Sequence, residues 1–268
     1  MIESASSTSK GRNRLSLVLR KAGELISIED VSAALSMQRA EASKLLAWWN
    51  TQGWIKRLRR GYYVPVPLAS FGQQQVLEDP WVMVPQLFGP ACIAGWSAAE
   101  HWGLTEQLFR STCVLTARKV RRKELTVQGF PFSLKHVKDS ALFGTRPIWR
   151  GRARVLVTDP AKTIVDMLDD PAIGGGIRHV TDCLRAYLER QDSRIDELIA
   201  MADKLGNGAI FKRLGFLAEI EGKQDALVAA CRARLTEGNA KLDPAALGHK
   251  LVKRWRLWVP GSYAEKRP

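Results

Sequence analysis

The stretch NRLSLVLRKAGELISIEDVSAALSMQRAEASKLLAWWNTQGWIKRLRRGYYVPVP, from Asn13 to Pro67, carries the strongest structural signal in the chain. Apolar residues between Leu15 and Leu19 recur at the spacing of an amphipathic helix, which is predicted to end near Gly23. Ser27 can cap a second helix, because two acids follow it where the positive end of the helix dipole favours them. The stretch therefore begins as a pair of helices.

A third helix is predicted from Met37 to Gln52, with Ala42, Leu46 and Trp49 on one face. Polar side chains occupy its N-terminal half, where a recognition helix contacts base edges. Arginine pairs bidentately with guanine and glutamine with adenine, whereas serine and lysine more often contact the DNA backbone. The expected DNA contacts of this helix are Gln38, Arg39, Ser43 and Lys44.

Gly53 ends the third helix, and the following residues predict two strands around an Arg59-Arg60-Gly61 turn. A hairpin at this position is typical of a winged helix-turn-helix. Its cations would lie against phosphates of a neighbouring groove, where counterion release supplies affinity. The expected wing contacts are Lys56, Arg57, Arg59 and Arg60. The alternative is a small folding unit whose basic turn is only solvated.

The charge of the whole chain favours a polyanionic partner. Its 268 residues include 41 Lys and Arg against 27 Asp and Glu, a formal net charge of +14. Nucleic acid is the first candidate and an anionic membrane surface the second. No apolar run approaches the ~20 residues of a spanning helix, so we expect no membrane partner.

Cysteine and histidine spacing predicts neither a metal site nor a cofactor. The four cysteines form no CxxC pair, and the four histidines add no ligand-like spacing. Residues 1–12 are polar and Ser-rich, unlike a secretory signal or a transit peptide, and are expected to be disordered. Together these features favour a cytoplasmic protein with reduced thiols.

The chain is expected to be α+β, with an N-terminal winged helix-turn-helix followed by a larger α+β domain. The predicted boundaries are a disordered start at 1–12, the winged helix at 13–67, a linker at 68–80, an α+β domain at 81–240 and a basic tail at 241–268. In the larger domain an antiparallel sheet is predicted first and helices after it. The predicted strands span 112–116, 125–127, 130–137, 143–149 and 154–157, and the helices 81–88, 97–103, 160–170, 177–188, 195–205 and 207–220.

No constellation of side chains predicts catalysis. His101 has acids nearby, but a histidine on a small-residue helix is more often structural. The carboxylates Asp159, Asp166, Asp169 and Asp170 do not all share a helix face, and Asp159 is better explained as a cap. We therefore expect that the chain is not an enzyme.

A second basic cluster follows the first predicted strand of the larger domain. It consists of Arg118, Lys119, Arg121, Arg122 and Lys123, and later strands carry further arginines that can lie nearby, namely Arg146, Arg150, Arg152 and Arg154. A solvated hairpin is one reading. The others are additional DNA contact, contact with an acidic protein partner and contact with RNA.

Four segments in order resemble the AbiEi antitoxin family of type IV toxin–antitoxin and phage-defence systems, over roughly residues 13 to 222. They are Arg60-Gly61-Tyr62-Tyr63-Val64-Pro65, the block from Ser97 to Gln107, Asp159-Pro160-Ala161-Lys162-Thr163-Ile164-Val165-Asp166, and Lys212-Arg213-Leu214-Gly215-Phe216-Leu217. The tail from Leu242 onward differs from the pattern of that family. We expect it to be a strand-like extension that places Leu251, Trp255, Leu257 and Val259 on the domain surface.

The resemblance implies a transcriptional autorepressor that binds repeated sites in its own operator through the winged helix. It also implies an antitoxin domain that neutralises a cognate nucleotidyltransferase-type toxin, directly or functionally. The sequence leaves the mode of neutralisation and the oligomeric state undecided. The alternative function is a nucleic-acid-processing enzyme or RNA-binding protein that uses the basic C-terminal domain.

Overall fold

A computed structural model of the chain describes residues 2–22, 25–59, 61–66, 79–222, 225–247 and 249–264, apart from the side chains of residues 2–9, 59, 249 and 264. The chain divides into two compact units. The first comprises Met1–Phe88, Thr126–Phe130 and Ile148–Val155, and the second comprises Gly89–Leu125, Pro131–Pro147 and Leu156–Pro268. Most of the linker predicted at 68–80 lies outside the described residues. The segment 81–88, expected in the second domain, groups with the first unit.

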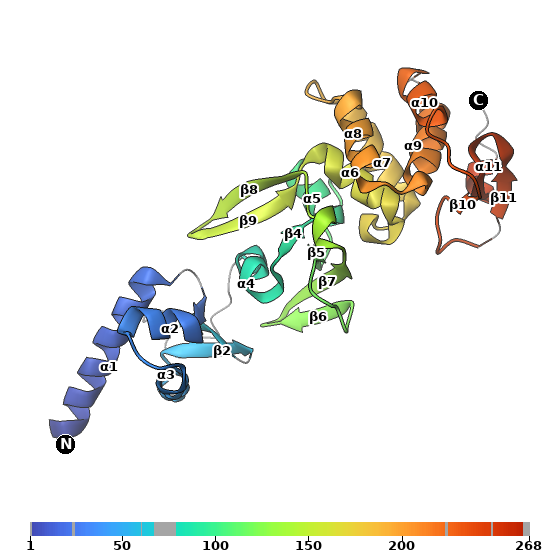
Figure 1. Cartoon of the computed structure of the whole chain (residues 1–268). Coiled ribbons are helices and arrows are strands. Elements are labelled where there is room, and N and C mark those ends of the chain that lie inside the picture. The colour runs from blue at the N-terminus through green and yellow to red at the C-terminus, as the bar shows by residue number, and fades with distance from the viewer. Residues whose placement is uncertain are drawn as a thin grey trace. The chain divides into compact units, whose positions relative to one another are not determined.

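The first unit combines helices with a small antiparallel sheet in the order β1-β3-β2 (Figure 1). Its elements are α1 (Ile2–Lys21), β1 (Ile26–Ser27), α2 (Ile28–Leu35), α3 (Arg39–Thr51), β2 (Ile55–Arg59), β3 (Tyr62–Pro65), the 3₁₀ turn η2 (Pro80–Met83) and α4 (Val84–Phe88). Val18, Val31, Leu46 and Trp49 are fully buried where the helices meet. The apolar spacing in the sequence thus supplies the core of this unit.

Local signals explain where α2 begins and ends. Ser27 and Asp30 form a capping box, in which the Ser27 hydroxyl accepts from the Asp30 amide and the Asp30 carboxylate accepts from the Ser27 amide. Ser36 adopts a left-handed conformation with φ 52° and ends the helix. Three residues, 36–38, then lead into α3.

Helix α1 is longer than expected, because it begins at Ile2 and includes residues predicted to be disordered. Its second half packs through Leu15 and Val18, and once a helix is nucleated each further residue adds a hydrogen bond. The helix also lies close against an aromatic pair. A Cβ added at Gly11 would be 2.6 Å from the ring of Trp48, which meets Trp54 edge-on with a centroid distance of 5.1 Å.

A six-stranded sheet in the order β6-β7-β5-β4-β9-β8 begins the larger α+β part of the chain. Its strands are β4 (Ala91–Ile93), β5 (Thr112–Thr116), β6 (Glu124–Val127), β7 (Phe130–His136), β8 (Thr145–Arg150) and β9 (Ala153–Thr158). The sheet is mixed and not wholly antiparallel as predicted, since β4 pairs parallel with β9 and β5 parallel with β7. The parallel β5–β7 pair arises because β6, which follows β5 in the chain, does not pair with β5. It lies outside β7, and β7 pairs with β5 in the same direction.

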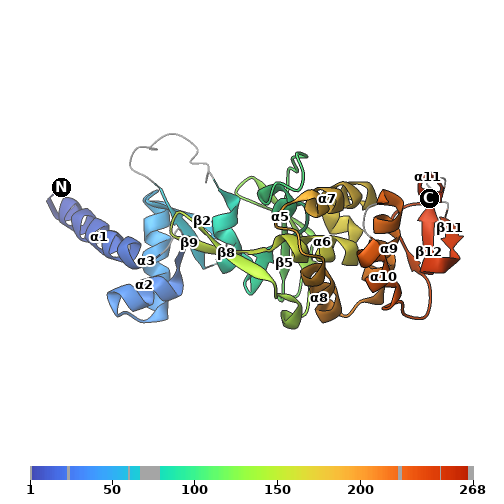
Figure 2. The same ribbon diagram turned by 90° about the horizontal axis from the view of Figure 1, so that it is seen from above.

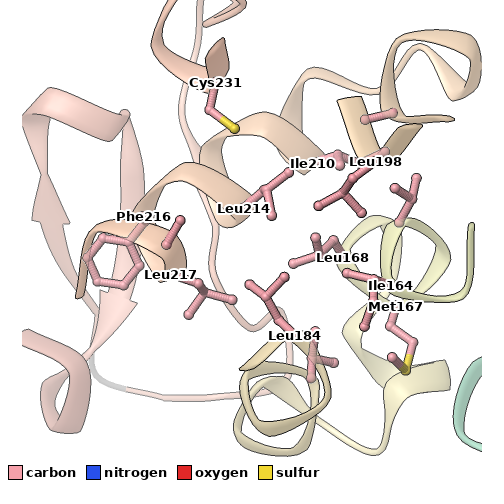
Figure 3. Close-up of a cluster of buried hydrophobic side chains, with 14 of the residues drawn as sticks. Ile164, Met167, Leu168, Leu184, Leu198, Ile210, Leu214, Phe216, Leu217 and Cys231 are labelled. Atoms are coloured by element: carbon pink, nitrogen blue, oxygen red, sulfur yellow. The ribbon is translucent and has the colours of Figure 1, made fainter. Parts of the chain in front are cut away.

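Most helices of this part follow the sheet, as predicted: α6 (Pro160–Asp169), the 3₁₀ turn η4 (Pro171–Gly174), α7 (Ile177–Glu189), α8 (Ile195–Leu205), α9 (Gly208–Glu221) and α10 (Asp225–Arg232). Helix α5 (Gly95–His101) lies between β4 and β5 in the chain, and the 3₁₀ turn η3 (Asp139–Ala141) lies between β7 and β8. Helices α5, α7, α8 and α9 pack against α6. Figure 3 shows Leu214 and Leu217 of α9 directed toward Leu168 of α6 and Leu184 of α7. All four side chains are fully buried. The α+β class is therefore correct for this chain.

The C-terminal residues form a second small sheet, ordered β10-β12-β11, beside α9 (Figure 2). Its elements are β10 (Ala240–Lys241), β11 (His249–Val252), the 3₁₀ turn η5 (Lys253–Trp255), β12 (Leu257–Pro260) and α11 (Gly261–Ala264). The expected surface position of Trp255, Leu257 and Val259 is wrong, because all three are fully buried in the same core as α6 and α9. The segment expected to be a basic tail therefore contributes apolar side chains to the core of α6 and α9.

Gly215 leaves the space that the Trp255 side chain occupies in this core. A Cβ at Gly215 would overlap the indole ring of Trp255, although Gly215 lies in the middle of α9. The indole Nε1 of Trp255 donates to Glu219 Oε2 at 2.6 Å, and Glu219 also forms ion pairs with Arg232 and Arg254. One carboxylate on α9 thus holds both α10 and the C-terminal segment.

Gly215→Ala is expected to destabilise the protein, although the same change in an unconstrained helix stabilises it by about 1 kcal/mol. The added methyl group would displace Trp255, and overpacking of a core costs about 1–3 kcal/mol. Urea unfolding followed by circular dichroism measures the difference. The matched control is Gly261→Ala, where an added Cβ meets no neighbour within 4 Å and stability should be unchanged or higher. Equal stability of both variants would contradict the packing argument.

Candidate nucleic-acid interface

The N-terminal half of α3 presents polar side chains to solvent. Ala42, Leu46 and Trp49 face the core, whereas Ser43 and Lys44 are exposed. Gln38 is the N-cap residue, and its side chain is exposed and makes no capping hydrogen bond. The burial pattern thus leaves Gln38, Ser43 and Lys44 accessible to a ligand.

Arg39 is accessible but already paired. Its Nη1 donates to Glu29 Oε1 on α2, and both side chains are largely exposed. A backbone amide hydrogen bond and then Arg39 lower the pKa of Glu29, so the carboxylate is charged at neutral pH. An exposed ion pair contributes only about 0–1 kcal/mol, so an anionic ligand can replace Glu29 at small cost. The sequence did not indicate this pair, because the two residues belong to different helices.

The β2–β3 hairpin follows α3 directly and is tied to it. Asn50 Oδ1 at the end of α3 accepts from the backbone amide of Arg57 at 3.0 Å. Lys56 and Arg57 are exposed on β2. The Arg59 side chain and all of Arg60, the other two expected wing contacts, lie outside the described residues. Gly61 has φ +86°, a conformation that favours glycine at the turn.

The second basic cluster lies between β5 and β6. All of its cations are exposed, namely Arg118, Lys119, Arg121, Arg122 and Lys123. The backbone carbonyl of Arg118 is hydrogen-bonded to His136 Nδ1 at 3.0 Å, and its amide donates to Thr116 Oγ1. These contacts fix the start of the segment beside the end of β7.

The arginines of β8 and β9 do not join that cluster. The sheet order places β6 at one edge and β8 at the other, with four strands between them. Several of these arginines have their own partners. Arg150 lies 3.5 Å from Asp79 and over the Trp81 ring, and Arg146 lies over the Trp102 ring. The sheet therefore has two separate basic edges.

The carboxylates suspected of chemistry have structural partners. Asp159 Oδ1 accepts from the Lys162 amide at 2.8 Å and caps α6, as predicted. Lys135 Nζ lies 3.1 Å from both Asp169 and Asp170. Burial opposes a charged Lys135, but these two carboxylates raise its pKa overall. Asp169 and Asp170 thus form ion pairs with Lys135 at the end of α6.

A buried ion pair lies at the centre of α6, and sequence spacing did not single it out. Lys162 Nζ donates to Asp166 Oδ1 one turn away, with 0% and 5% of the two side chains exposed. Burial raises the pKa of Asp166 to about 6 against the opposing effect of Lys162. Asp166 Oδ2 accepts no hydrogen bond from any described residue. The i,i+4 spacing was visible, but burial on all sides of α6 was not.

The cysteines are buried and free. Burial raises the pKa of Cys92, Cys183 and Cys231 to about 12, so their thiols are protonated at neutral pH and weakly nucleophilic. His179 lies beside Cys183, but its Nδ1 is hydrogen-bonded to Gly174 O at 2.6 Å and its Nε2 to Thr105 Oγ1 at 2.9 Å. His179 therefore fixes the turn before α7.

Comparison with models of known protein families gives no match for this sequence, and comparison with curated proteins gives no relative. Across the described residues, no three His, Cys, Asp or Glu side chains are grouped as metal ligands. In the same part of the chain, none of the helices has the length and apolar character needed to cross a bilayer.

Lys162→Met is expected to lower the free energy of unfolding by about 3–5 kcal/mol at pH 8, because it leaves the Asp166 charge buried without a partner. The loss should shrink at pH 5. Burial raises the pKa of Asp166 and Lys162 opposes that rise, so loss of Lys162 raises this pKa further. As pH falls, the folded variant therefore takes up its proton before the unmodified protein does and recovers part of the lost stability. Urea unfolding at both pH values measures this.

Lys204→Met is the matched control, since Lys204 is exposed and contacts the same Phe143 ring at 4.3 Å. It should change stability by well under 1 kcal/mol. A Lys162→Met loss that is small, or that does not depend on pH, would contradict the buried-pair argument.

Proposed function

We propose that this chain is a DNA-binding transcriptional autorepressor and antitoxin, whose first unit acts as a winged helix-turn-helix. The observation that carries the proposal is the polar N-terminal end of α3, where Gln38, Ser43 and Lys44 are exposed outside the buried stripe of Ala42, Leu46 and Trp49. A helix that enters the major groove reads bases with this part of its surface.

The neighbouring elements support this reading. Helices α2 and α3 are joined by a three-residue connection, and the β2–β3 hairpin follows α3 through the Asn50–Arg57 hydrogen bond. Winged helix-turn-helix domains have helices and a hairpin in this order, which supports the proposal. Residues 1–66 include eleven Lys and Arg and five Asp and Glu, and this excess of positive charge favours a DNA partner.

The antitoxin part of the proposal rests on the resemblance of the four ordered segments to the AbiEi family. Three of them meet in the second unit. Trp102 Nε1 donates to the carbonyl of Thr158 at 2.6 Å, just before α6. Arg213 Nη1 donates to Leu168 O at 2.6 Å and to Asp169 O at 3.0 Å, at the end of α6. Two of the quoted segments are thus hydrogen-bonded to residues that flank the third, which supports a common framework for a surface that binds a nucleotidyltransferase-type toxin.

A gel-shift series with the native DNA upstream of the gene tests operator binding. Retardation by that DNA, with weaker retardation of unrelated duplexes, is the expected result. Lys44→Ala should reduce the retardation because it removes an exposed cation of α3. Absence of retardation at any protein concentration would overturn the proposal.

Glu29→Gln is expected to strengthen operator binding several-fold, because it frees Arg39 from its intramolecular partner. Arg39→Ala should weaken binding, by about 1–3 kcal/mol if the side chain reads a base. Fluorescence anisotropy with labelled operator DNA measures both. The matched control is Asp196→Asn, which breaks the exposed Arg194–Asp196 pair on α8 and removes one negative charge in the same way. Equal gains for Glu29→Gln and Asp196→Asn would indicate a net-charge effect only.

The hairpin is expected to contact phosphates. Lys56→Ala and Arg57→Ala should each weaken binding to all sequences alike and reduce the slope of log K against log salt by about one. Lys204→Ala, a change of one exposed cation in the second unit, should leave the slope unchanged. An unchanged slope in the hairpin variants would remove the hairpin from the interface.

Co-expression with the cognate nucleotidyltransferase-type toxin that the proposal implies tests the antitoxin role. The full chain should restore growth, and a Ser43→Ala, Lys44→Ala variant that no longer retards the operator should restore it equally. Loss of rescue in that variant would place neutralisation in DNA binding. Failure of the unmodified chain to restore growth would overturn the antitoxin role.

A further inference from the structure

A pocket of about 350 Å³ opens within the first unit, alongside α1 and the base of the β2–β3 hairpin. This volume is at the lower end of the range typical of small-molecule sites. Its lining residues are Arg12, Leu15, Ser16, Leu19, Arg20, Trp54, Pro65, Val66 and Arg152.

The walls of the pocket are apolar. Leu15 and Trp54 line the pocket, and only 8% of each residue is exposed. Leu19, Pro65 and Val66 are half-buried around them. Such a surface gains free energy when an aliphatic or aromatic body covers it.

The polar part of the lining is cationic. It contains three arginines, and none of the described lining residues is acidic. The Arg12 guanidinium lies over the Trp54 ring, 5.5 Å from its centroid, and Arg152 Nη1 donates to Leu19 O at 3.4 Å. Among the described residues, neither Arg12 nor Arg20 is paired with a carboxylate. These guanidinium groups can therefore take an external anion.

We infer that this pocket binds a small organic anion, with an apolar body on Leu15 and Trp54 and a carboxylate or phosphate head on the arginines. Apolar walls alone would accept a neutral molecule, and surface arginines alone would accept an inorganic anion. Their combination in one pocket selects a molecule that carries both parts. Arginine is suited to such heads because its fork of donors matches carboxylate and phosphate geometry.

The pocket also connects the ligand to the hairpin. Trp54 immediately precedes β2, Pro65 ends β3 and Val66 follows it, with the Val66 amide donating to Trp54 O at 2.9 Å. A ligand here would contact both ends of the hairpin and the packed face of α1. Because the hairpin is proposed to contact DNA phosphates, a ligand that contacts both of its ends would alter operator binding. This consequence rests on the proposed function.

Calorimetric titration of the full chain with decanoate, below its micelle-forming concentration, tests the pocket. Decanoate should bind at one site, and decanol, which has the same chain without the charge, should bind at least ten-fold more weakly. Arg12→Ala and Arg20→Ala should each weaken decanoate by about ten-fold, as expected for loss of a charged hydrogen bond. Arg14→Ala, an exposed arginine of α1 outside the pocket, should have no effect.

Ser16→Trp supplies the second test, because this exposed serine lines the pocket and a large side chain there would fill it. It should abolish decanoate binding with an unchanged melting temperature, whereas Asn13→Trp, exposed on α1 outside the lining, should bind normally. No decanoate binding, equal binding of decanol, or unchanged binding in Ser16→Trp would overturn the inference.

Anisotropy with labelled operator DNA, with and without decanoate, tests the coupling. The operator dissociation constant should change with decanoate in the unmodified chain and stay constant in Ser16→Trp. An unchanged constant in the unmodified chain would overturn the coupling while the calorimetric result stands. If the chain binds no DNA at all, the proposed function fails and the pocket is still judged by calorimetry.

Discussion

Helix α6 is buried on every face, and this constraint organises the second unit. Each residue from Pro160 to Leu168 is buried, including a lysine and an aspartate. Polar groups in such a position are stable only with internal partners. Asp159 therefore caps the start, Lys162 and Asp166 pair at the centre, and Arg213 hydrogen-bonds the last carbonyls.

The same constraint extends to the C-terminus. Arg213 belongs to α9, which is itself covered by Trp255 and the strands around it. Gly215 permits this cover by leaving space for the indole ring, and Glu219 fixes it by accepting from the indole nitrogen. The segment from β10 to α11 therefore contributes side chains to the core.

The first unit differs from the second in where its charged side chains lie. Its core is small and apolar, and most of its charged side chains remain at the surface. Arg39 is held by Glu29 in a weak exposed pair, and three arginines surround an apolar pocket. Surface pairs of this kind are easily exchanged for an external anion, whereas the buried pairs of α6 are not. This contrast supports the proposal that the first unit binds a ligand through its surface, whereas α6 is structural.

The sequence by itself determined most helices and strands, because apolar periodicity, capping residues and glycines act over a few neighbouring residues. The Ser27 cap, the Asp159 cap and the apolar stripe of α3 were all predictable in this way. The mixed sheet, the separation of the two basic edges, the Lys162–Asp166 burial and the insertion of Trp255 were decided only by the tertiary structure. Each of these depends on which distant segments come together, and the local spacing of residues does not specify that.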